Sequence, residues 1–139
     1  FKQKIIIAGH PRAKNDRKRN FQKRKIKFDQ TYKLIKNSKL VLTHYSTAIY
    51  FACLLQKPIL IFFTNEMKKS NYLMGCLKSF SSSLGVQNIN INEFDLKKLK
   101  VNLKIDKNRY NRFIKDYITM SNSKKSNHEI LEQKLADLI

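Results

Sequence analysis

Two short polar motifs follow apolar segments and carry residue types that bind phosphate. The motif GHPR at 9–12 comes directly after IIIA at 5–8, and Ser46-Thr47 comes shortly after LVLT at 40–43. Imidazole, guanidinium and hydroxyl groups can all donate hydrogen bonds to phosphate oxygens. If the two apolar segments are neighbouring strands of a parallel sheet, both motifs lie at its carboxyl edge, where such folds bind ligands. The pattern therefore predicts a pocket for a phosphate ester.

The residues of the first motif have distinct expected roles. Pro11 fixes the backbone, so that His10 is held at the tip of a strand and can donate a hydrogen bond to phosphate. Arg12 adds a guanidinium that can grip the same anion. The ordinary alternative is a simple turn that carries a surface histidine.

The second motif and its neighbours also have two explanations each. Ser46 and Thr47 either bind the anion or simply cap the helix that follows, a common role for these residues. His44 is either a third polar wall of the pocket or a structural histidine. Glu66, just after the next apolar segment, either meets a sugar hydroxyl or caps a helix. His128 is not expected to take part.

The elements that must position these residues alternate along the chain. Apolar runs predict buried strands, and one-sided apolar periodicity predicts helices between them. Asp29 or Thr31 is expected to cap the first helix, and Gly85 to end the helix at 70–84. The expected strands are 4–8, 39–43 and 59–64, with a short one at 25–28 and another at 86–91 that its asparagines weaken. The expected helices are 31–37, 46–55, 70–84, 106–120 and 127–139.

This order predicts an α/β fold with a Rossmann-like, three-layer architecture, in which helices flank a short parallel sheet. We expect one domain over 1–139, with an α/β core at 1–105 and two C-terminal helices at 106–139. The length of 139 residues supports one modest core. Since Phe1 is not a natural start, we expect the chain to be a piece of a longer protein. No apolar run approaches the length of a membrane span.

The charge of the chain favours an anionic partner. Lys and Arg number 29 against 10 Asp and Glu, which gives a net charge of +19. No glycine-rich phosphate loop, nucleophile triad, carboxylate pair or metal-type cluster is present in the sequence. Cys53 and Cys76 are expected to be reduced, buried thiols. The sequence thus predicts anion binding without an obvious catalytic group.

Two stretches resemble the donor-binding half of bacterial surface-polysaccharide glycosyltransferases of the two-domain GT-B type. They are 5–12 (IIIAGHPR) and 34–67 (LIKNSKLVLTHYSTAIYFACLLQKPILIFFTNEM). A His-Pro motif, a Ser-Thr pair before a helix and a Lys-Pro before an apolar strand resemble the pattern of bacterial sialyl- and polysialyltransferases, which use CMP-sialic acid. Teichoic-acid glycerophosphotransferases, which use CDP-glycerol, are also similar. They usually carry Asp-Tyr-Ser-Ser where this chain has His44-Tyr45-Ser46-Thr47.

The resemblance implies a role for each motif residue. His10, Ser46 and Thr47 would contact the nucleotide phosphate, His10 would stabilise it as the leaving group, and Pro11 and Arg12 would support them. The donor would be a CMP-linked sugar, the acceptor a glycan such as capsule or lipooligosaccharide, and no metal or other cofactor would be needed. The general base would belong to an N-terminal acceptor domain outside this chain, so this chain holds no catalytic residue of its own and is expected to be inactive alone. The C-terminal helices would pack back toward that domain.

Other interpretations of the function stay open. One is a glycerophosphotransferase of the teichoic-acid type. Another is a basic nucleic-acid-binding module, since Phe21, Phe28 and Tyr32 lie among basic residues, although no recognisable reading motif is present. A third is a non-catalytic fragment. We expect a cytoplasmic protein whose basic segment at 12–27 attracts either an anionic acceptor or the anionic inner face of the membrane.

Overall fold

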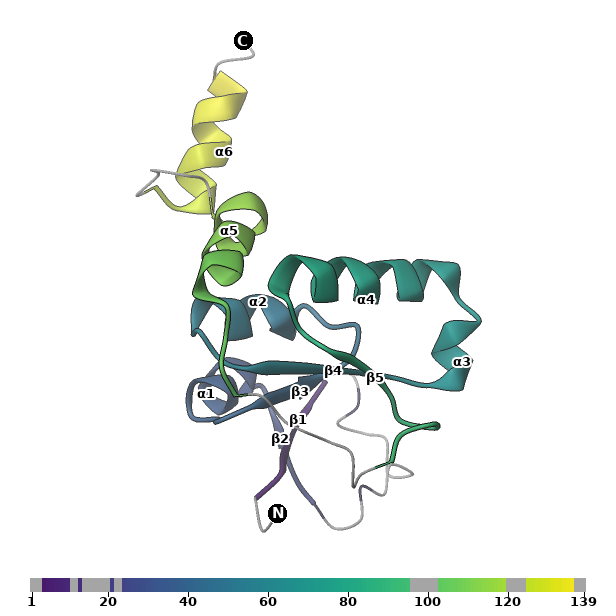
Figure 1. Ribbon diagram of the computed structural model, residues 1–139. Helices are drawn as coiled ribbons and strands as arrows, with labels where there is room; N and C mark the ends of the chain where they lie inside the picture. The colour runs from purple at the N-terminus through teal and green to yellow at the C-terminus, as the bar shows by residue number, and fades with distance from the viewer. Residues whose placement is uncertain are drawn as a thin grey trace.

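The computed structural model describes residues 4–10, 13, 21, 24–95, 103–119 and 125–136. It shows an α/β chain with short parallel sheets flanked by helices, compatible with a Rossmann-like fold (Figure 1). Among the helices in these ranges, none combines the length and the hydrophobicity of a membrane span.

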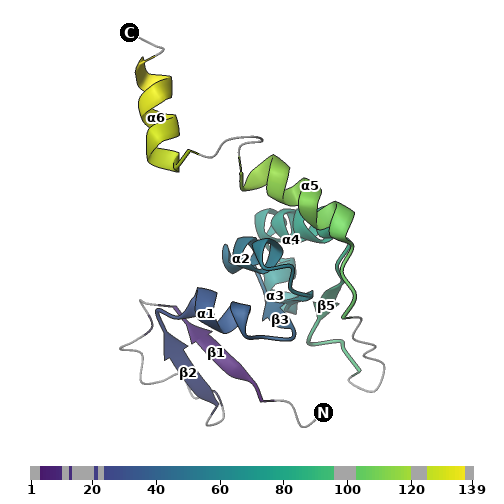
Figure 2. The same ribbon diagram turned by 90° about the vertical axis from the view of Figure 1, so that its left-hand side faces the viewer.

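The described strands are all parallel and form two separate sheets. One sheet pairs β1 (Ile6–Gly9) with β2 (Lys25–Phe28). The other holds β3 (Val41–Thr43), β4 (Ile59–Phe63) and β5 (Asn88–Asn90) in that order. Figure 2 shows the β1–β2 pair set apart from the three-stranded sheet. The sequence led us to expect that β1 and β3 are neighbours in one sheet. That expectation is wrong, because the two strands belong to different sheets.

The first strand also differs from its expected environment. Its apolar run predicts a buried strand, but Ile5 and Ile6 are exposed and Ile7 is only half-buried. A two-stranded sheet has few neighbours to cover its faces, so its apolar residues stay accessible. An apolar run favours extended backbone, but it does not specify which strand or layer it will pack against.

Helices pack on the three-stranded sheet and contribute most of its core. The described helices are α1 (Thr31–Lys36), α2 (Ala48–Leu54), α3 (Asn65–Lys68), α4 (Asn71–Leu84), α5 (Lys107–Tyr117) and α6 (Asn127–Ala136). In Figure 1, α2, α4 and α5 lie on one side of this sheet, and in both views α6 extends away from the rest. The four-residue α3 is not among the helices expected from sequence.

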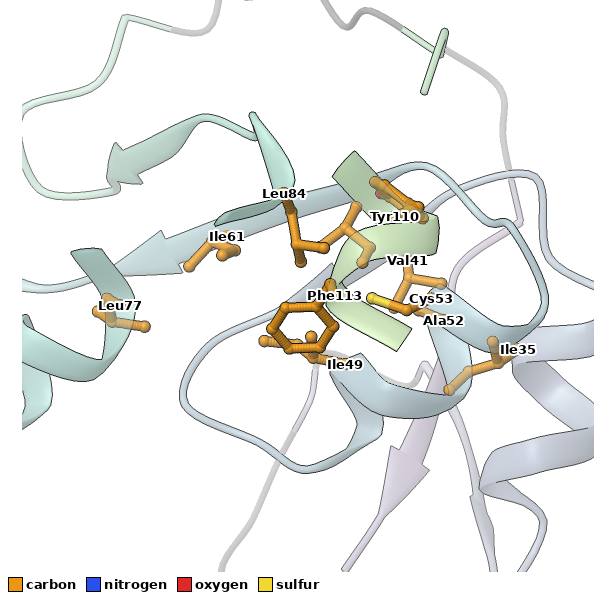
Figure 3. Packing of buried hydrophobic residues seen from close by; sticks show 11 residues of the cluster. Ile35, Val41, Ile49, Ala52, Cys53, Ile61, Leu77, Leu84, Tyr110 and Phe113 are labelled. Atoms are coloured by element: carbon orange, nitrogen blue, oxygen red, sulfur yellow. The ribbon is translucent and has the colours of Figure 1, made fainter. Parts of the chain in front are cut away.

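The hydrophobic core lies between β3–β4 and the helices, as Figure 3 shows. In β4, Ile59 and Ile61 alternate toward this core, as side chains on a strand do. α5 belongs to the core: the Tyr110 hydroxyl donates to the Lys57 carbonyl oxygen at 3.1 Å, and burial raises the pKa of Tyr110. The buried cluster consists of Ile35, Val41, Ile49, Ala52, Cys53, Ile59, Ile61, Leu77, Leu84, Tyr110 and Phe113.

The ends of the longer helices follow from capping chemistry. Ser70 Oγ accepts a hydrogen bond from the Leu73 N–H, and Gly85 ends α4 at φ 67° in the left-handed conformation, as expected. Asp106 Oδ1 caps α5 through the Arg109 N–H. The expected cap of α1 is wrong: Gln30 occupies that position without a side-chain hydrogen bond. Asp29 instead turns the chain with φ 55°.

Gly9 is required by close packing within the β1–β2 pair. Its register partner is Phe28, and a Cβ atom built on Gly9 would lie 2.6 Å from Phe28 Cδ1 and 2.9 Å from Ile26 Cγ2. We expect Gly9→Ala to weaken this pairing by about 1–2 kcal/mol, because the Phe28 ring must move. Faster amide hydrogen exchange in β2, with exchange in β4 unchanged, would show the effect. Unchanged protection of β2 would contradict it.

Candidate functional site

A polar cavity lies at the carboxyl edge of the three-stranded sheet. Its volume is about 350 Å³, and it is bounded by residues that follow β4 and β5: Thr64, Asn65, Glu66, Lys69 and Asn92. Each of these side chains ends in a hydroxyl, carboxamide, carboxylate or ammonium group. The cavity is open to solvent, and its lining offers both donors and acceptors of hydrogen bonds.

Three asparagines tie the ends of β4 and β5 together and fix one wall of the cavity. The Asn65 N–H donates to Asn92 Oδ1 at 2.8 Å, and Asn90 Nδ2 donates to Asn65 Oδ1 at 2.7 Å. The Asn92 N–H donates to Asn90 Oδ1 at 3.1 Å. The first two of these bonds connect residues that are 27 and 25 positions apart in the chain. We call Asn65, Asn90 and Asn92 the asparagine cluster.

Local structure also positions the charged groups around the cavity. Thr64 Oγ1 accepts from the Met67 N–H and begins α3, which carries Glu66 in its first turn. Beside the cavity, Lys68 Nζ lies 2.8 Å from Glu93 Oε1, and this hydrogen bond lowers the pKa of Glu93. Both partners of that ion pair are exposed, so its effect on stability is small. One expected role of Glu66 was to cap the next helix. Thr64 caps α3 instead, so contact with a sugar hydroxyl is the role of Glu66 that stays a prediction.

Ser46 and Thr47 lie at the end of β3, the strand beside β4. Ser46 Oγ accepts from the Ala48 N–H at 3.2 Å, so it serves the start of α2, while Thr47 makes no side-chain cap bond. A hydroxyl that accepts one bond can still donate its proton. His44 is exposed, and its carbonyl oxygen accepts from the Thr43 hydroxyl at 3.2 Å.

His10 is placed differently from these residues. It follows β1, is exposed, and its carbonyl oxygen accepts from the Ala13 N–H at 2.8 Å. Because β1 belongs to the other sheet, no shared strand edge joins His10 to Ser46. The topology does bring Ser46, Thr47 and Glu66 to one edge, since β3 and β4 are parallel neighbours. Pro11 and Arg12 lie outside the described residues.

Sequence reasoning missed the asparagine cluster and Lys69. The segment Asn88–Asn92 alternates asparagine and isoleucine, and its asparagines were expected only to weaken the strand. The alternation itself was the available signal, because it places polar side chains on one face at the end of a strand. Lys69 carries no such signal, since lysine is frequent throughout the chain.

A pair of tyrosines lies near the same edge. Tyr45 follows β3 and Tyr72 lies in the first turn of α4, and their hydroxyl oxygens are 2.9 Å apart. Their rings meet edge to face at a centroid distance of 5.9 Å. The hydrogen bond to Tyr45 is the main cause that raises the pKa of Tyr72 to about 12. This contact links the loop after β3 to α4.

In the described part of the chain, neither the two cysteines nor a cluster of metal-binding side chains forms a second candidate site. Cys53 is buried in α2, where burial raises its pKa to about 12 and makes the thiol unreactive. Cys76 is only half-buried, which differs from the expectation, and both thiols are free. No group of three or more metal-binding side chains occurs among the described residues.

Comparison of the chain with models of protein families, with curated proteins and with solved structures finds no match. The residues at the carboxyl edge of the β3–β4–β5 sheet therefore provide the indication of function.

Proposed function

We propose that this chain binds a nucleotide sugar, with a CMP-linked sugar as donor, for a glycosyltransferase that builds a cell-surface glycan at the cytoplasmic side of the membrane. The observation that carries this proposal is the polar cavity after β4 and β5. It lies where parallel α/β folds bind ligands. Carboxamide, carboxylate and hydroxyl groups in the lining match the many donors and acceptors of a sugar. Glu66 would accept hydrogen bonds from sugar hydroxyls.

The phosphate would bind toward the neighbouring strand end. Ser46 and Thr47 follow β3, whose register pairs Thr43 with Ile61 of β4, so their backbone lies at the same edge as the cavity. During transfer the bond between the anomeric carbon and the phosphate oxygen breaks, and negative charge develops on the departing CMP. Hydroxyls at this edge would stabilise that charge. His10 follows β1 of the other sheet and would have to reach the same phosphate from there. The base that deprotonates the acceptor would come from outside this chain.

The lining of the cavity favours a sugar over glycerol. A CDP-glycerol donor carries few hydroxyls beyond its phosphates, so most polar groups of the cavity would gain no partner from it. Polar groups that lose water on ligand binding without gaining a new partner weaken that binding. This difference separates the sugar proposal from the glycerophosphotransferase alternative.

Calorimetric titration of the full chain with CMP-sialic acid, CDP-glycerol, CMP and AMP tests the proposal. We expect CMP-sialic acid to bind at least about tenfold more tightly than CMP, because the sugar adds hydrogen bonds in the cavity. AMP should bind more weakly than CMP. Equal affinities for all four ligands, or no binding at millimolar concentration, would contradict the proposal. Steeply salt-dependent RNA binding that CMP does not displace would favour the nucleic-acid module instead.

A further inference from the structure

Three large apolar side chains are exposed together on the outer surface of α1 and α2. Tyr32 is 50%, Phe51 40% and Leu54 43% exposed. The Tyr32 and Phe51 rings meet edge to face with centroids 5.8 Å apart, so the two helices present one continuous apolar surface. Phe51 and Leu54 are three positions apart on α2 and therefore share a helix face. The buried side of the same helix is formed by Ile49, Ala52 and Cys53.

The sequence that forms α1 and α2 carries only positive charges. Between Asp29 and Glu66 the chain has no acidic residue, whereas it carries Lys33, Lys36, Lys39 and Lys57. Lys33 and Lys36 are exposed in the last turn of α1, next to Tyr32 along the chain. We call Tyr32, Lys33, Lys36, Phe51 and Leu54 the α1–α2 patch.

We propose that the α1–α2 patch docks this protein onto an anionic lipid bilayer. Phe51, Leu54 and the Tyr32 ring enter the boundary between headgroups and acyl chains, as apolar side chains of interfacial helices do. Lys33 and Lys36 lie at the level of the lipid phosphates and gain from the negative surface potential. Charge complementarity favours the negatively charged leaflet over a neutral one.

The composition of the patch favours a bilayer over a nucleic acid. Single strands bind to aromatic rings whose faces are open for stacking. Leu54 has no aromatic face on which a base could stack. In the Tyr32–Phe51 pair, the edge of one ring contacts the face of the other, so that face is not open to a base. An aliphatic side chain beside two aromatic rings matches the residues found on the apolar side of membrane-surface helices.

Co-sedimentation of the full chain with phosphatidylcholine vesicles, with and without phosphatidylglycerol, tests this proposal. We expect binding to the anionic vesicles and little binding to the neutral ones. The double variant Phe51→Ser/Leu54→Ser should weaken binding roughly tenfold or more, since it removes the inserted side chains. Lys33→Gln/Lys36→Gln should weaken it to a similar degree, roughly tenfold, and should reduce its sensitivity to salt.

Matched control variants lie outside the patch. Leu131→Ser on α6 and Lys78→Gln on α4 alter an exposed apolar and an exposed basic residue, and both should bind as the parent does. All four replaced side chains are exposed, so we expect the patch variants to remain folded. Circular dichroism and the melting temperature check this. The assay contains no nucleotide, so its result is independent of the proposed nucleotide site.

Several results would overturn the inference. One is equal binding of the parent to neutral and anionic vesicles, or no binding to either. Another is that Lys33→Gln/Lys36→Gln loses binding while Phe51→Ser/Leu54→Ser binds fully. Binding would then come from unspecific attraction between charges, without insertion of apolar side chains. Binding of a generic RNA that depends on these residues, without vesicle binding, would assign the patch to nucleic acid.

Discussion

Replacing Ile61 with alanine should lower the free energy of unfolding by about 2–5 kcal/mol, the range for large-to-small changes in a core. Ile61 is 0% exposed and lies in the central strand, paired with Thr43 on one side and Asn88 on the other. Its side chain belongs to the cluster drawn in Figure 3, to which α2, α4 and α5 all contribute. The surrounding helices cannot collapse into the space without losing contacts with each other. Denaturant unfolding followed by circular dichroism measures the loss.

Leu42→Ala provides the matched control for this loss. Leu42 lies on the adjacent strand β3 but is 47% exposed, so its truncation leaves little cavity. We expect it to cost less than about 1 kcal/mol. If both variants lost the same stability, the core would not lie where the helices cover β4.

Removal of the Glu66 carboxylate should produce the largest effect on ligand binding. In Glu66→Gln, the sugar hydroxyls lose an ionised acceptor, which is worth about 1.5–3 kcal/mol for a charged hydrogen bond. The Kd for CMP-sialic acid should therefore rise roughly 10- to 100-fold, while the Kd for CMP alone changes less than about twofold. Calorimetric titration measures both constants. Glu93→Gln is the control, since Glu93 is an exposed carboxylate bound to Lys68 outside the cavity lining.

His10→Ala should give the complementary result. If His10 donates to the phosphate, both CMP and CMP-sialic acid should bind roughly tenfold more weakly. His10 is exposed, so the melting temperature should hardly change. His128→Ala on α6 is the matched control. Unchanged affinity in the His10 variant would remove this residue from the phosphate site and leave Ser46 and Thr47 as its candidates.

Local patterns predicted much of the fold in this chain. The helices near 70–84 and 106–120 were expected from one-sided apolar spacing, and α4 and α5 occupy most of those ranges. Ser70, Gly85 and Asp106 mark their ends through bonds and angles that depend on a few neighbouring residues. The apolar run at 59–64 became the central strand β4. Such features can be read from sequence because their causes lie within one or two turns of the chain.

The candidate site was predictable only in part. Glu66 lines the cavity after β4, and its expected contact with a ligand stays a prediction. The pairing of β1 with β2 instead of β3 was not predictable, since both partners are short segments that satisfy the same backbone hydrogen bonds. The asparagine cluster was missed because its hydrogen bonds join β4 and β5 across 25 or more positions.

By itself the sequence determined an α/β alternation, the positions of the main helices and a strong excess of positive charge. These follow from spacing, capping chemistry and composition, which act locally or as simple sums. Only the tertiary structure decided that the strands divide into two sheets, that α5 joins the core, and that a polar cavity forms beyond β4 and β5. Those features depend on which distant surfaces pack together, and many segments of similar hydrophobicity could compete for each contact.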